Sequence, residues 1–342
     1  MNTKLYKLKN YPGNEIKFAA HMEKRQLGTS DVHITPILMG TWQAGKKQWV
    51  GIEDADSIKA IRAAVDAGIT TIDTAEVYGQ GHSERIVAEA LSDRRDQVEY
   101  ATKVFASHLK YNQVIEACEN SLKNLKTDHI DLYQIHWPSG AFNTEIVPIE
   151  ETMRALNELK TQGKIRAIGV SNFSRTQLEE ASQYGRIDSL QPPYSLFWRY
   201  VEKDAVPYCV ENQISIIAYS PLAQGLLTGK FEKGHKFEEG DNRTANKLFQ
   251  GENFERAHQA LEKLRPIAES HNCTLAQLAI AWLIAQPQSN AIVGARNAEQ
   301  AVANAKAATV KLSEQDLQQI DQIGRLVTDH LDDSPGMWTW AA

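Results

Sequence analysis

The sequence of 342 residues predicts an α/β fold, a (β/α)8 or TIM barrel in which parallel strands alternate with helices. Eight short runs of apolar and β-branched residues recur along the chain, and each is followed by a stretch with helical periodicity. This alternation continues for about 270 residues without a linker or a change in composition. An open doubly wound sheet is the alternative, but GTWQAG after the first strand does not match the G-x-G-x-x-G fingerprint.

Ahead of the barrel, the sequence predicts two smaller features. Residues 1–21 mix Lys, Glu and Asn with apolar residues and lack the continuous apolar core of a signal peptide. We therefore expect an N-terminal extension, ordered or disordered, before a single domain over residues 22–342. Within that domain, residues 25–37 alternate loosely around a Gly-Thr-Ser-Asp turn, which predicts a β-hairpin.

The barrel elements follow from periodicity and from residues typical of helix ends. The first barrel helix, for example, has acids in its first turn and stops at Gly68. The predicted strands are 37–42, 69–73, 98–104, 129–137, 164–172, 187–191, 214–220 and 290–294. The predicted helices are 53–67, 82–91, 111–126, 149–162, 176–185, 201–213, 252–270, 274–286 and 297–307.

One connection is much longer than the others. Residues 221–251 follow the seventh barrel strand and are rich in glycine, charge and aromatic residues. A minimal strand-to-helix loop needs only a few residues. Long loops at the active rim of a barrel generally carry function, so we expect this loop to cover a bound molecule.

Composition narrows the partners and the compartment. The net charge is −6 and no basic stripe is evident, which disfavours nucleic acid or an anionic membrane as the main partner. Three widely separated cysteines without metal-ligand spacing indicate free thiols in a reducing cytoplasm. No apolar run approaches the ~20 residues of a membrane span. No heptad or long exposed apolar strip suggests assembly, so we expect a cytoplasmic monomer.

Polar residues recur at the ends of three successive strands. Asp73, Lys103 and His136 each close a predicted strand, and Tyr78 lies in the glycine-rich turn after the first of them. Parallel neighbouring strands end on the same rim of the sheet, so these side chains should converge. Taken singly, each residue has an ordinary structural explanation, such as a helix cap or a satisfied core histidine. Their recurrence at matching strand ends favours a functional site.

The four residue types suit proton transfer to a carbonyl oxygen. A free tyrosine has a pKa of about 10 and is a weak acid near neutral pH. We expect the ammonium of Lys103, held by Asp73, to favour the anion of Tyr78 and so lower its pKa. His136 can donate to or orient the same oxygen. Because a proton alone does not reduce a carbonyl, a hydride donor is also required.

Several motifs, in this order, resemble those of the aldo-keto reductases, which are NAD(P)H-dependent carbonyl reductases built on a (β/α)8 barrel. The motifs are GITTIDTAEVYG, ATKV, DLYQIHWP, KIRAIGVSNF, QPPYS, AYSPLAQGLLTGK and IVGARNAEQAVANA. They span residues 22–326, nearly the whole chain. The resemblance implies Tyr78 as general acid, Lys103 and Asp73 as its tuning pair, and His136 as the residue that orients the substrate oxygen.

The resemblance also implies where NADPH or NADP+ binds. The implied cofactor-binding residues are Thr41, Trp42, Ser171, Asn172, Gln191, Tyr219, Ser220, Leu222, Gly225, Leu226, Lys230, Gly294, Arg296, Gln300 and Asn304. Among these, Ser171, Asn172 and Gln191 look like carboxamide clamps, and Tyr219 looks like the ring that stacks on the nicotinamide.

Cofactor preference rests on the last of these segments. Arg296 can pair with a 2′-phosphate beside a helix N-terminus, which favours NADPH over NADH. Many animal members of the family carry a lysine where this chain has Gly294. The expected 2′-phosphate site of this chain therefore has fewer positive charges than theirs. The motif G-A-R-N resembles that of bacterial and plant branches of the family, in which an arginine binds the 2′-phosphate. Binding of NADH, more weakly than NADPH, is a further expectation.

Aromatic residues near the strand ends predict an apolar substrate pocket. Trp42, Phe105 and Trp137 are its expected lining, and Trp49, Trp198, Trp338 and Trp340 are further candidates. The expected function is NADPH-dependent reduction of aldehydes or ketones to alcohols. The alternative is a cofactor-binding regulatory subunit, similar to the potassium-channel β subunits that share this barrel.

Overall fold

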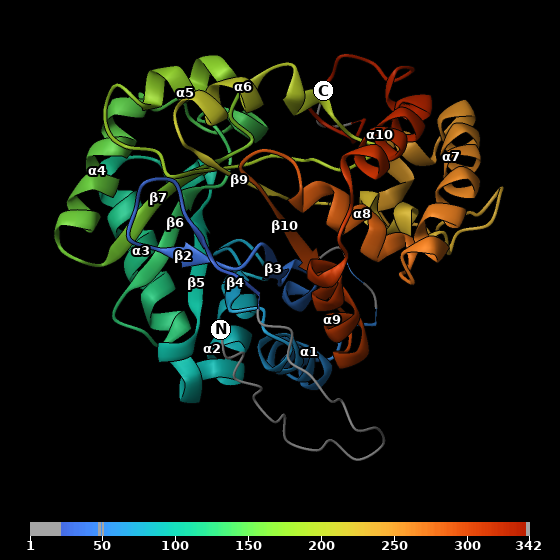
Figure 1. Cartoon of the computed structure of the whole chain (residues 1–342). Coiled ribbons are helices and arrows are strands. Elements are labelled where there is room, and N and C mark those ends of the chain that lie inside the picture. The colour runs from blue at the N-terminus through green and yellow to red at the C-terminus, as the bar shows by residue number, and fades with distance from the viewer. Residues whose placement is uncertain (1–21, 47–48, 50, 340–342) are drawn as a thin grey trace.

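A computed structural model describes residues 22–46, 49 and 51–339, and it contains the predicted closed barrel (Figure 1). Every pair of neighbouring barrel strands is parallel, in the order β10-β3-β4-β5-β6-β7-β8-β9, with β9 closing onto β10. The strands are β3 (Ile37–Gly40), β4 (Thr71–Asp73), β5 (Glu99–Val104), β6 (Ile130–Ile135), β7 (Ile165–Ser171), β8 (Ser189–Gln191), β9 (Ser215–Ala218) and β10 (Ser289–Gly294). The predicted extension, residues 1–21, lies outside the described residues.

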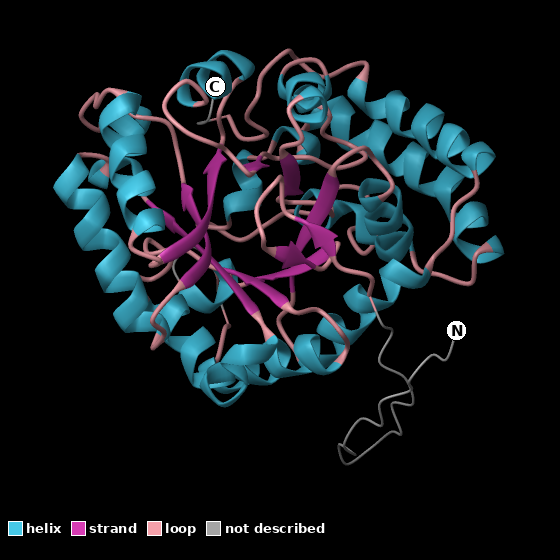
Figure 2. Cartoon of the chain, turned by 60° about the vertical axis from the view of Figure 1, so that its left-hand side comes forward, coloured by secondary structure: helices cyan, strands magenta, loops and turns pink. Residues whose placement is uncertain are grey.

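Helices surround the barrel strands on the outside (Figure 2). All nine predicted helices are present, with ends that differ from the prediction by a few residues. They are α1 (Asp54–Asp66), α2 (His82–Leu91), α3 (Tyr111–Leu125), α4 (Ile149–Thr161), α5 (Arg175–Ala181), α6 (Ala205–Glu211), α7 (Gly251–Ser270), α8 (Leu275–Ile284) and α9 (Ala298–Lys306).

The sequence prediction missed one helix, α10 (Glu314–Thr328). Its N-terminus carries a capping box, in which Ser313 accepts from the backbone of Asp316 and the Asp316 side chain accepts in return. Ile320, Ile323 and Val327 are buried at helical spacing. Both signals are visible in the sequence, but they follow the eighth strand-helix unit, where the barrel period ends.

The predicted hairpin closes the N-terminal end of the barrel. It consists of β1 (Arg25–Gln26) and β2 (His33–Ile34), which pair antiparallel. Gly28, with φ of 58°, lies so close to the start of β8 that an added Cβ would stand 2.6 Å from the carbonyl oxygen of Asp188. The hairpin and barrel interior share one apolar cluster, which contains Leu27, Val32, Ile34, Leu38, Ala101, Leu132, Ala167, Ile217 and Ile292.

Inside the barrel, side chains change from apolar to polar along the strands. On β5, Ala101 belongs to the apolar cluster, and Lys103 stands two residues further on. On β6, Leu132 is followed at the same spacing by Gln134. Residues two apart on a strand face the same side. The polar layer therefore lies at the carboxyl ends of the strands, opposite the hairpin.

The long loop after β9 contains short 3-10 turns, at Ala223–Thr228, Asn242–Ala245 and Lys247–Phe249. The C-terminal tail pairs with this loop. The backbone N–H of Lys247 donates to the carbonyl of Met337 at 2.9 Å, and that of Thr339 donates to Ala245 at 2.9 Å. Loop and tail thus form one layer at the end of β9.

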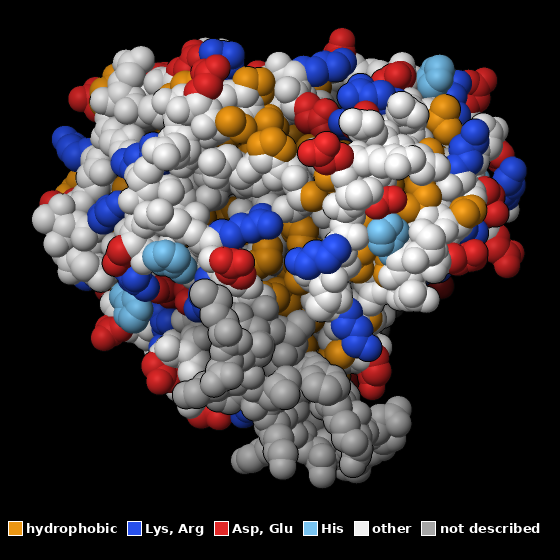
Figure 3. Space-filling view, in the orientation of Figure 1, with side chains coloured by type: hydrophobic (Ala, Val, Ile, Leu, Met, Phe, Trp, Pro, Cys, Tyr) orange, Lys and Arg blue, Asp and Glu red, His pale blue; other side chains and the backbone are white. Residues whose placement is uncertain are grey.

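The described surface agrees with the composition. Figure 3 shows acidic and basic side chains interspersed over one face of the molecule. No helix among the described residues is long and apolar enough to cross a membrane. Cys118, Cys209 and Cys273 are free thiols, the first two of them buried.

Candidate active site

Asp73 and Lys103 form a buried ion pair at the carboxyl ends of β4 and β5. The Lys103 Nζ atom lies 2.6 Å from Oδ1 of Asp73 and also donates to the Thr74 carbonyl at 2.7 Å. The other carboxylate oxygen accepts from the amides of Gln191, at 3.0 Å, and Gln134, at 3.3 Å. Burial of two charges is costly unless their hydrogen-bonding capacity is used in this way.

Tyr78 lies above this pair, as the sequence predicted. The Nζ atom of Lys103 is 5.2 Å from the centroid of the Tyr78 ring. The His136 ring meets the Tyr78 ring edge-on, with centroids 5.6 Å apart. Asp73, Lys103, Tyr78 and His136 therefore converge, although they come from three strand ends and a loop.

Two glycines hold the Tyr78 loop in place. An added Cβ on Gly45 would stand 2.8 Å from the carbonyl carbon of Tyr78, closer than such contacts allow. Gly79 has φ of 62°, and a Cβ there would stand 2.5 Å from the carbonyl oxygen of Gly45. The backbone after β3 thus packs directly on the backbone that carries Tyr78, because neither residue has a side chain.

Burial controls the protonation of the site. It raises the pKa of Tyr78 well above the ordinary value, and the charge of Asp73 raises it further. The sequence-based expectation of a lowered pKa for Tyr78 is therefore not met, because desolvation of the phenolate dominates. Tyr78 consequently carries its proton at neutral pH, as a proton donor must.

The two basic groups are also affected by burial. Burial lowers the pKa of Lys103, with the attraction of Asp73 opposing it. Burial, and then repulsion by Lys103, lowers the pKa of His136 well below the ordinary value. His136 is therefore neutral near pH 7 and acts through hydrogen bonding rather than charge.

Aromatic side chains surround the four residues. The ring centroids of Trp42 and Tyr78 are 6.4 Å apart, and those of Phe105 and His136 are 5.8 Å apart. Sequence reasoning missed Phe142, which stacks on Phe105 at 5.7 Å and meets Trp137 at 5.0 Å. Phe142 has φ of 55° and is 51% exposed. Phe142 lies in a short turn without periodicity. Its aromatic character was therefore the one signal in the sequence that could have marked it.

The other candidate tryptophans have different surroundings. Trp198 is 1% exposed, and its indole donates to the Pro335 carbonyl, so it belongs to the core and does not line a pocket. Trp338 is also buried, and its ring lies parallel to Tyr219 with centroids 6.3 Å apart. Trp340 lies outside the described residues.

The expected nicotinamide clamps form a connected network. The Ser171 hydroxyl, at the end of β7, donates to the Gln191 carbonyl at 2.7 Å. Asn172 has φ of 61°, and its side-chain oxygen accepts from the Tyr219 hydroxyl at 2.9 Å. Its amide donates to the carbonyl of His136 at 3.1 Å. The network links the clamps to the four central residues.

Thr41, another expected cofactor-binding residue, already has partners. Its hydroxyl donates to the Asp73 carbonyl at 3.0 Å and shares a hydrogen bond with Ser83 at 2.7 Å. The side chain is 2% exposed. In this arrangement Thr41 fastens β3 to β4, and its contact with a cofactor stays a prediction.

The turn after β9, where the diphosphate is expected to bind, has an unusual backbone conformation. Ser220, Ala223, Gln224 and Gly225 all have positive φ, between 48° and 96°. Two N–H groups of this turn are used within it, since Ala223 donates to the Ser220 carbonyl at 2.8 Å and Gly225 to the Leu222 carbonyl at 2.9 Å. The expected Leu222 and Leu226 belong to the same turn.

Three cations gather beside this turn. Burial lowers the pKa of Lys230, and repulsion by Arg243 and then Arg296 lowers it further, partly opposed by Asp241. Like charges held together are a common feature of sites for anions. Sequence reasoning missed Arg243, because it lies in an irregular loop away from every motif.

The expected adenosine end is built by β10 and α9. The Gln300 side chain accepts from the backbone N–H of Arg296 at 2.9 Å, and Asn304 donates to the carbonyl of Gly294 at 3.2 Å. These bonds fix the turn at the N-terminus of α9, where backbone N–H groups favour anions. Both Gly294 and Arg296 are exposed there.

A dinucleotide fits the polar atoms of this rim. Among the described residues, the buried side-chain atoms without a hydrogen-bond partner include some on segments that follow barrel strands, namely Gln43 Oε1, Trp49 Nε1, His136 Nδ1, Arg199 Nη1 and Gln224 Nε2. Buried polar atoms normally have partners. A polar molecule bound at this rim would supply partners for atoms such as His136 Nδ1 and Gln224 Nε2. The described residues contain no cluster of side chains that could hold a metal ion.

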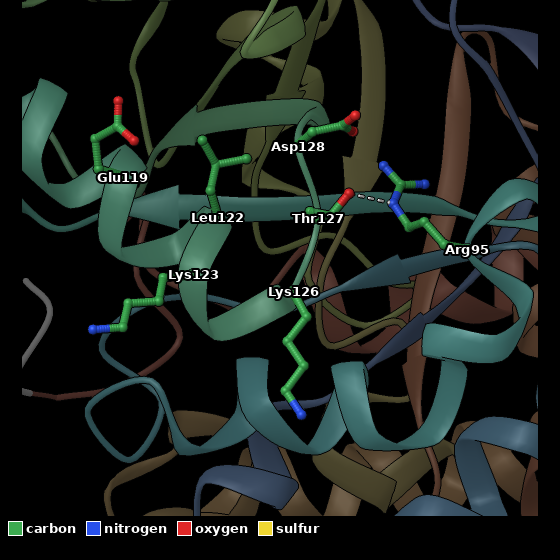
Figure 4. A pocket seen from close by; sticks show the side chains of 7 residues that line it. All are labelled: Arg95, Glu119, Leu122, Lys123, Lys126, Thr127 and Asp128. Atoms are coloured by element: carbon green, nitrogen blue, oxygen red, sulfur yellow. Dashed lines mark hydrogen bonds between the residues drawn. The ribbon is translucent and has the colours of Figure 1, made fainter.

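A separate hollow lies away from this rim (Figure 4). Arg95, Lys126 and Asp128 line it, at segments that precede strands β5 and β6. Arg95 there pairs with Asp131 at 2.8 Å and donates to Thr127 at 2.8 Å. These contacts lie at the N-terminal ends of the strands, where barrel residues serve stability.

Comparison with known proteins agrees with the geometry. Residues 36–325 match the aldo/keto reductase family. The aldo-keto reductase YhdN of Bacillus subtilis is 39% identical over 314 residues, 88% of this chain and 93% of that protein. The NADH-specific methylglyoxal reductase of Escherichia coli is 36% identical over 318 residues, which are 86% of this chain and 96% of that protein. A structure of an aldo/keto reductase from Klebsiella pneumoniae in complex with NADP and acetate has a TM-score of 0.69 and 30% identity, covering 88% of this chain and 95% of that one.

Proposed function

The chain belongs to the aldo/keto reductase family, and from this premise we propose how its rim residues reduce a carbonyl group. The protein is an NAD(P)H-dependent oxidoreductase. The observation that carries the proposal is the convergence of Tyr78, Lys103, Asp73 and His136, with a phenol that stays protonated at neutral pH.

Each of the four residues has a distinct role. The bound cofactor, when reduced, supplies a hydride from nicotinamide C4 to the carbonyl carbon. Tyr78 gives its proton to the carbonyl oxygen, which becomes the alcohol. Neutral His136 hydrogen bonds to that oxygen and orients it. Lys103, fixed by Asp73, places a positive charge under the Tyr78 ring as the phenolate forms.

Cofactor binding uses the rest of the rim. Ser171, Asn172 and Gln191 would hold the carboxamide, and Tyr219 would stack on the nicotinamide ring. The turn from Ser220 to Leu226, with Lys230, would hold the diphosphate. We add Arg243 to this group, because its Cζ atom and the Nζ atom of Lys230 lie 5.4 Å and 4.9 Å from the centroid of the same Phe231 ring. Arg243 also pairs with Asp241. Gly294, Arg296, Gln300 and Asn304 would enclose the adenosine end.

We propose NADPH as the preferred cofactor and NADH as a weaker one. The clustered charges of Lys230, Arg243 and Arg296 support recognition of a 2′-phosphate. The Escherichia coli relative is named for NADH, so related chains differ in this preference.

The substrates we propose are small aldehydes, ketones and dicarbonyls with an apolar portion. The rings of Trp42, Phe105 and Trp137, together with Phe142, support this class by offering an apolar wall beside His136. Methylglyoxal belongs in the test panel because a relative is named for it.

We further propose that the protein works as a monomer in the cytoplasm, without nucleic acid or membrane partners. Free cysteines and mixed surface charge support this proposal. Among the described residues, the exposed large apolar side chains are few, namely Phe142, Ile146, Tyr184, Val210 and Leu326. Light scattering during gel filtration measures the mass directly.

The purified protein tests the reaction. NADPH oxidation is followed with a panel of aliphatic and aromatic aldehydes, ketones and methylglyoxal, with buffer lacking a carbonyl as control. Turnover at about 1 per second or faster with a panel member supports an enzyme. Tight NADPH binding without turnover of any carbonyl would favour the regulatory-subunit alternative.

A further inference from the structure

Trp49 and Arg296 contact each other across the gap between two neighbouring strand ends. The Cζ atom of Arg296 lies 5.5 Å from the centroid of the Trp49 ring. Arg296 follows β10 and Trp49 follows β3, and these strands pair with Gly40 opposite Gly294. The contact therefore joins the two sides of the expected adenosine end.

The Trp49 ring is itself supported. It meets Trp42 edge-on with centroids 5.2 Å apart, and Trp42 packs near Tyr78. The same segment approaches β10 elsewhere, because a Cβ on Gly294 would stand 3.2 Å from Oε1 of Gln43. The exposed side chain of Arg296 thus rests on a ring that itself packs against Trp42.

A guanidinium can stack and bind phosphate at the same time. Stacking on an indole uses the flat face of the group, while a phosphate receives hydrogen bonds from N–H groups in its plane. Trp49 therefore does not compete with an anion for Arg296. Stacking on Trp49 restricts the orientations open to the arginine side chain. Restricting a side chain before binding reduces the entropy lost on binding.

We propose that Trp49 is a positioning residue that holds Arg296 ready for the 2′-phosphate and so increases the preference for NADPH over NADH. This inference rests on the proposed cofactor-binding role of Arg296. It adds a residue that touches no phosphate itself and lies about 250 positions away in sequence, joined to Arg296 only by the closure of the barrel.

A double-mutant cycle in cofactor affinity tests the proposal. The Kd values of NADP+ and NAD+ are measured by isothermal titration calorimetry for wild type, W49A, W49F, R296A and W49A/R296A. We expect W49A to raise the Kd of NADP+ roughly threefold to tenfold and to change that of NAD+ by less than about twofold. W49F keeps an aromatic face and should stay close to wild type. In the R296A background, W49A should have no further effect on NADP+.

The other outcomes are equally informative. Equal weakening of NADP+ and NAD+ by W49A, or a full additional effect of W49A in the R296A background, would overturn the role of Trp49. R296A with unchanged NADP+ affinity would overturn it as well, since nothing would remain to be positioned. Failure of the wild type to bind either cofactor would instead contradict the proposed function. Thermal unfolding of each variant confirms that the fold is kept.

Discussion

The ammonium of Lys103 lies 2.6 Å from a carboxylate oxygen of Asp73, although 30 residues separate the two in sequence. Gln191, 118 residues from Asp73, donates to the same carboxylate. Closure of the parallel strands creates this arrangement. The pair is buried, so its stability depends on every partner that the barrel brings to it.

Removal of Lys103 alone should destabilise the protein strongly. K103M leaves the Asp73 carboxylate buried without its ammonium, and we expect the free energy of unfolding to fall by about 3–5 kcal/mol. K103M/D73N should recover part of that loss, because no unpaired charge remains. Urea unfolding followed by circular dichroism measures both. Wild-type stability for K103M would show that the ion pair is more solvated than described.

His136 should make stability depend on pH in a defined direction. Its folded-state pKa is lowered, so below the unfolded value of about 6.5 the unfolded chain binds more protons than the folded one. The free energy of unfolding should then fall as pH decreases from about 6.5, by up to about 1.4 kcal/mol per unit. Above that pH, His136 contributes no slope.

The measurement compares wild type with H136N between pH 7.5 and pH 5. The two proteins differ only at position 136, so the difference between their curves isolates that residue. H136N should show the weaker pH dependence. Parallel curves for the two proteins would mean that His136 is not held neutral by burial.

Gly45 should affect catalysis through the position of Tyr78. A methyl group in G45A would stand 2.8 Å from the Tyr78 backbone and must push that loop away. We expect kcat to fall roughly tenfold or more, because small displacements of a catalytic group are costly. G163A is the control for an added methyl group without a clash, since nothing lies within 4 Å of its added Cβ. Its φ of 74° adds backbone strain, so the stability of both variants is measured beside kcat. Similar kcat values for G45A and wild type would show that the loop adjusts freely.

Much of this architecture was accessible from the sequence because it is periodic. Strand-helix alternation predicted the barrel, and matching strand ends predicted that Asp73, Lys103 and His136 converge. Gln134 was missed, although a polar residue inside the apolar strand Ile130–Ile135 is a visible signal. Its partner is a carboxylate on another strand, and one strand considered alone does not reveal that contact.

Other features depend on long-range packing that local patterns do not encode. The direction of the Tyr78 pKa shift depends on burial of the phenol, which raises that pKa, and then on the charge of Asp73. Arg243 and Phe142 lie in irregular segments, so neither spacing nor periodicity marked them. The parallel contact of Trp338 with Tyr219 requires the tail to pair with the long loop, which no motif predicts.

Substitution of the Tyr78 hydroxyl tests the central claim most directly. At saturating NADPH, Y78F should reduce a carbonyl substrate about 10²- to 10⁴-fold more slowly than wild type, because the proton donor is lost. The Kd of NADP+ should stay unchanged, and Y184F, at a tyrosine that is 40% exposed, should behave as wild type. Near wild-type turnover by Y78F, or an equal loss of turnover and cofactor binding, would contradict the assignment of Tyr78 as the proton donor.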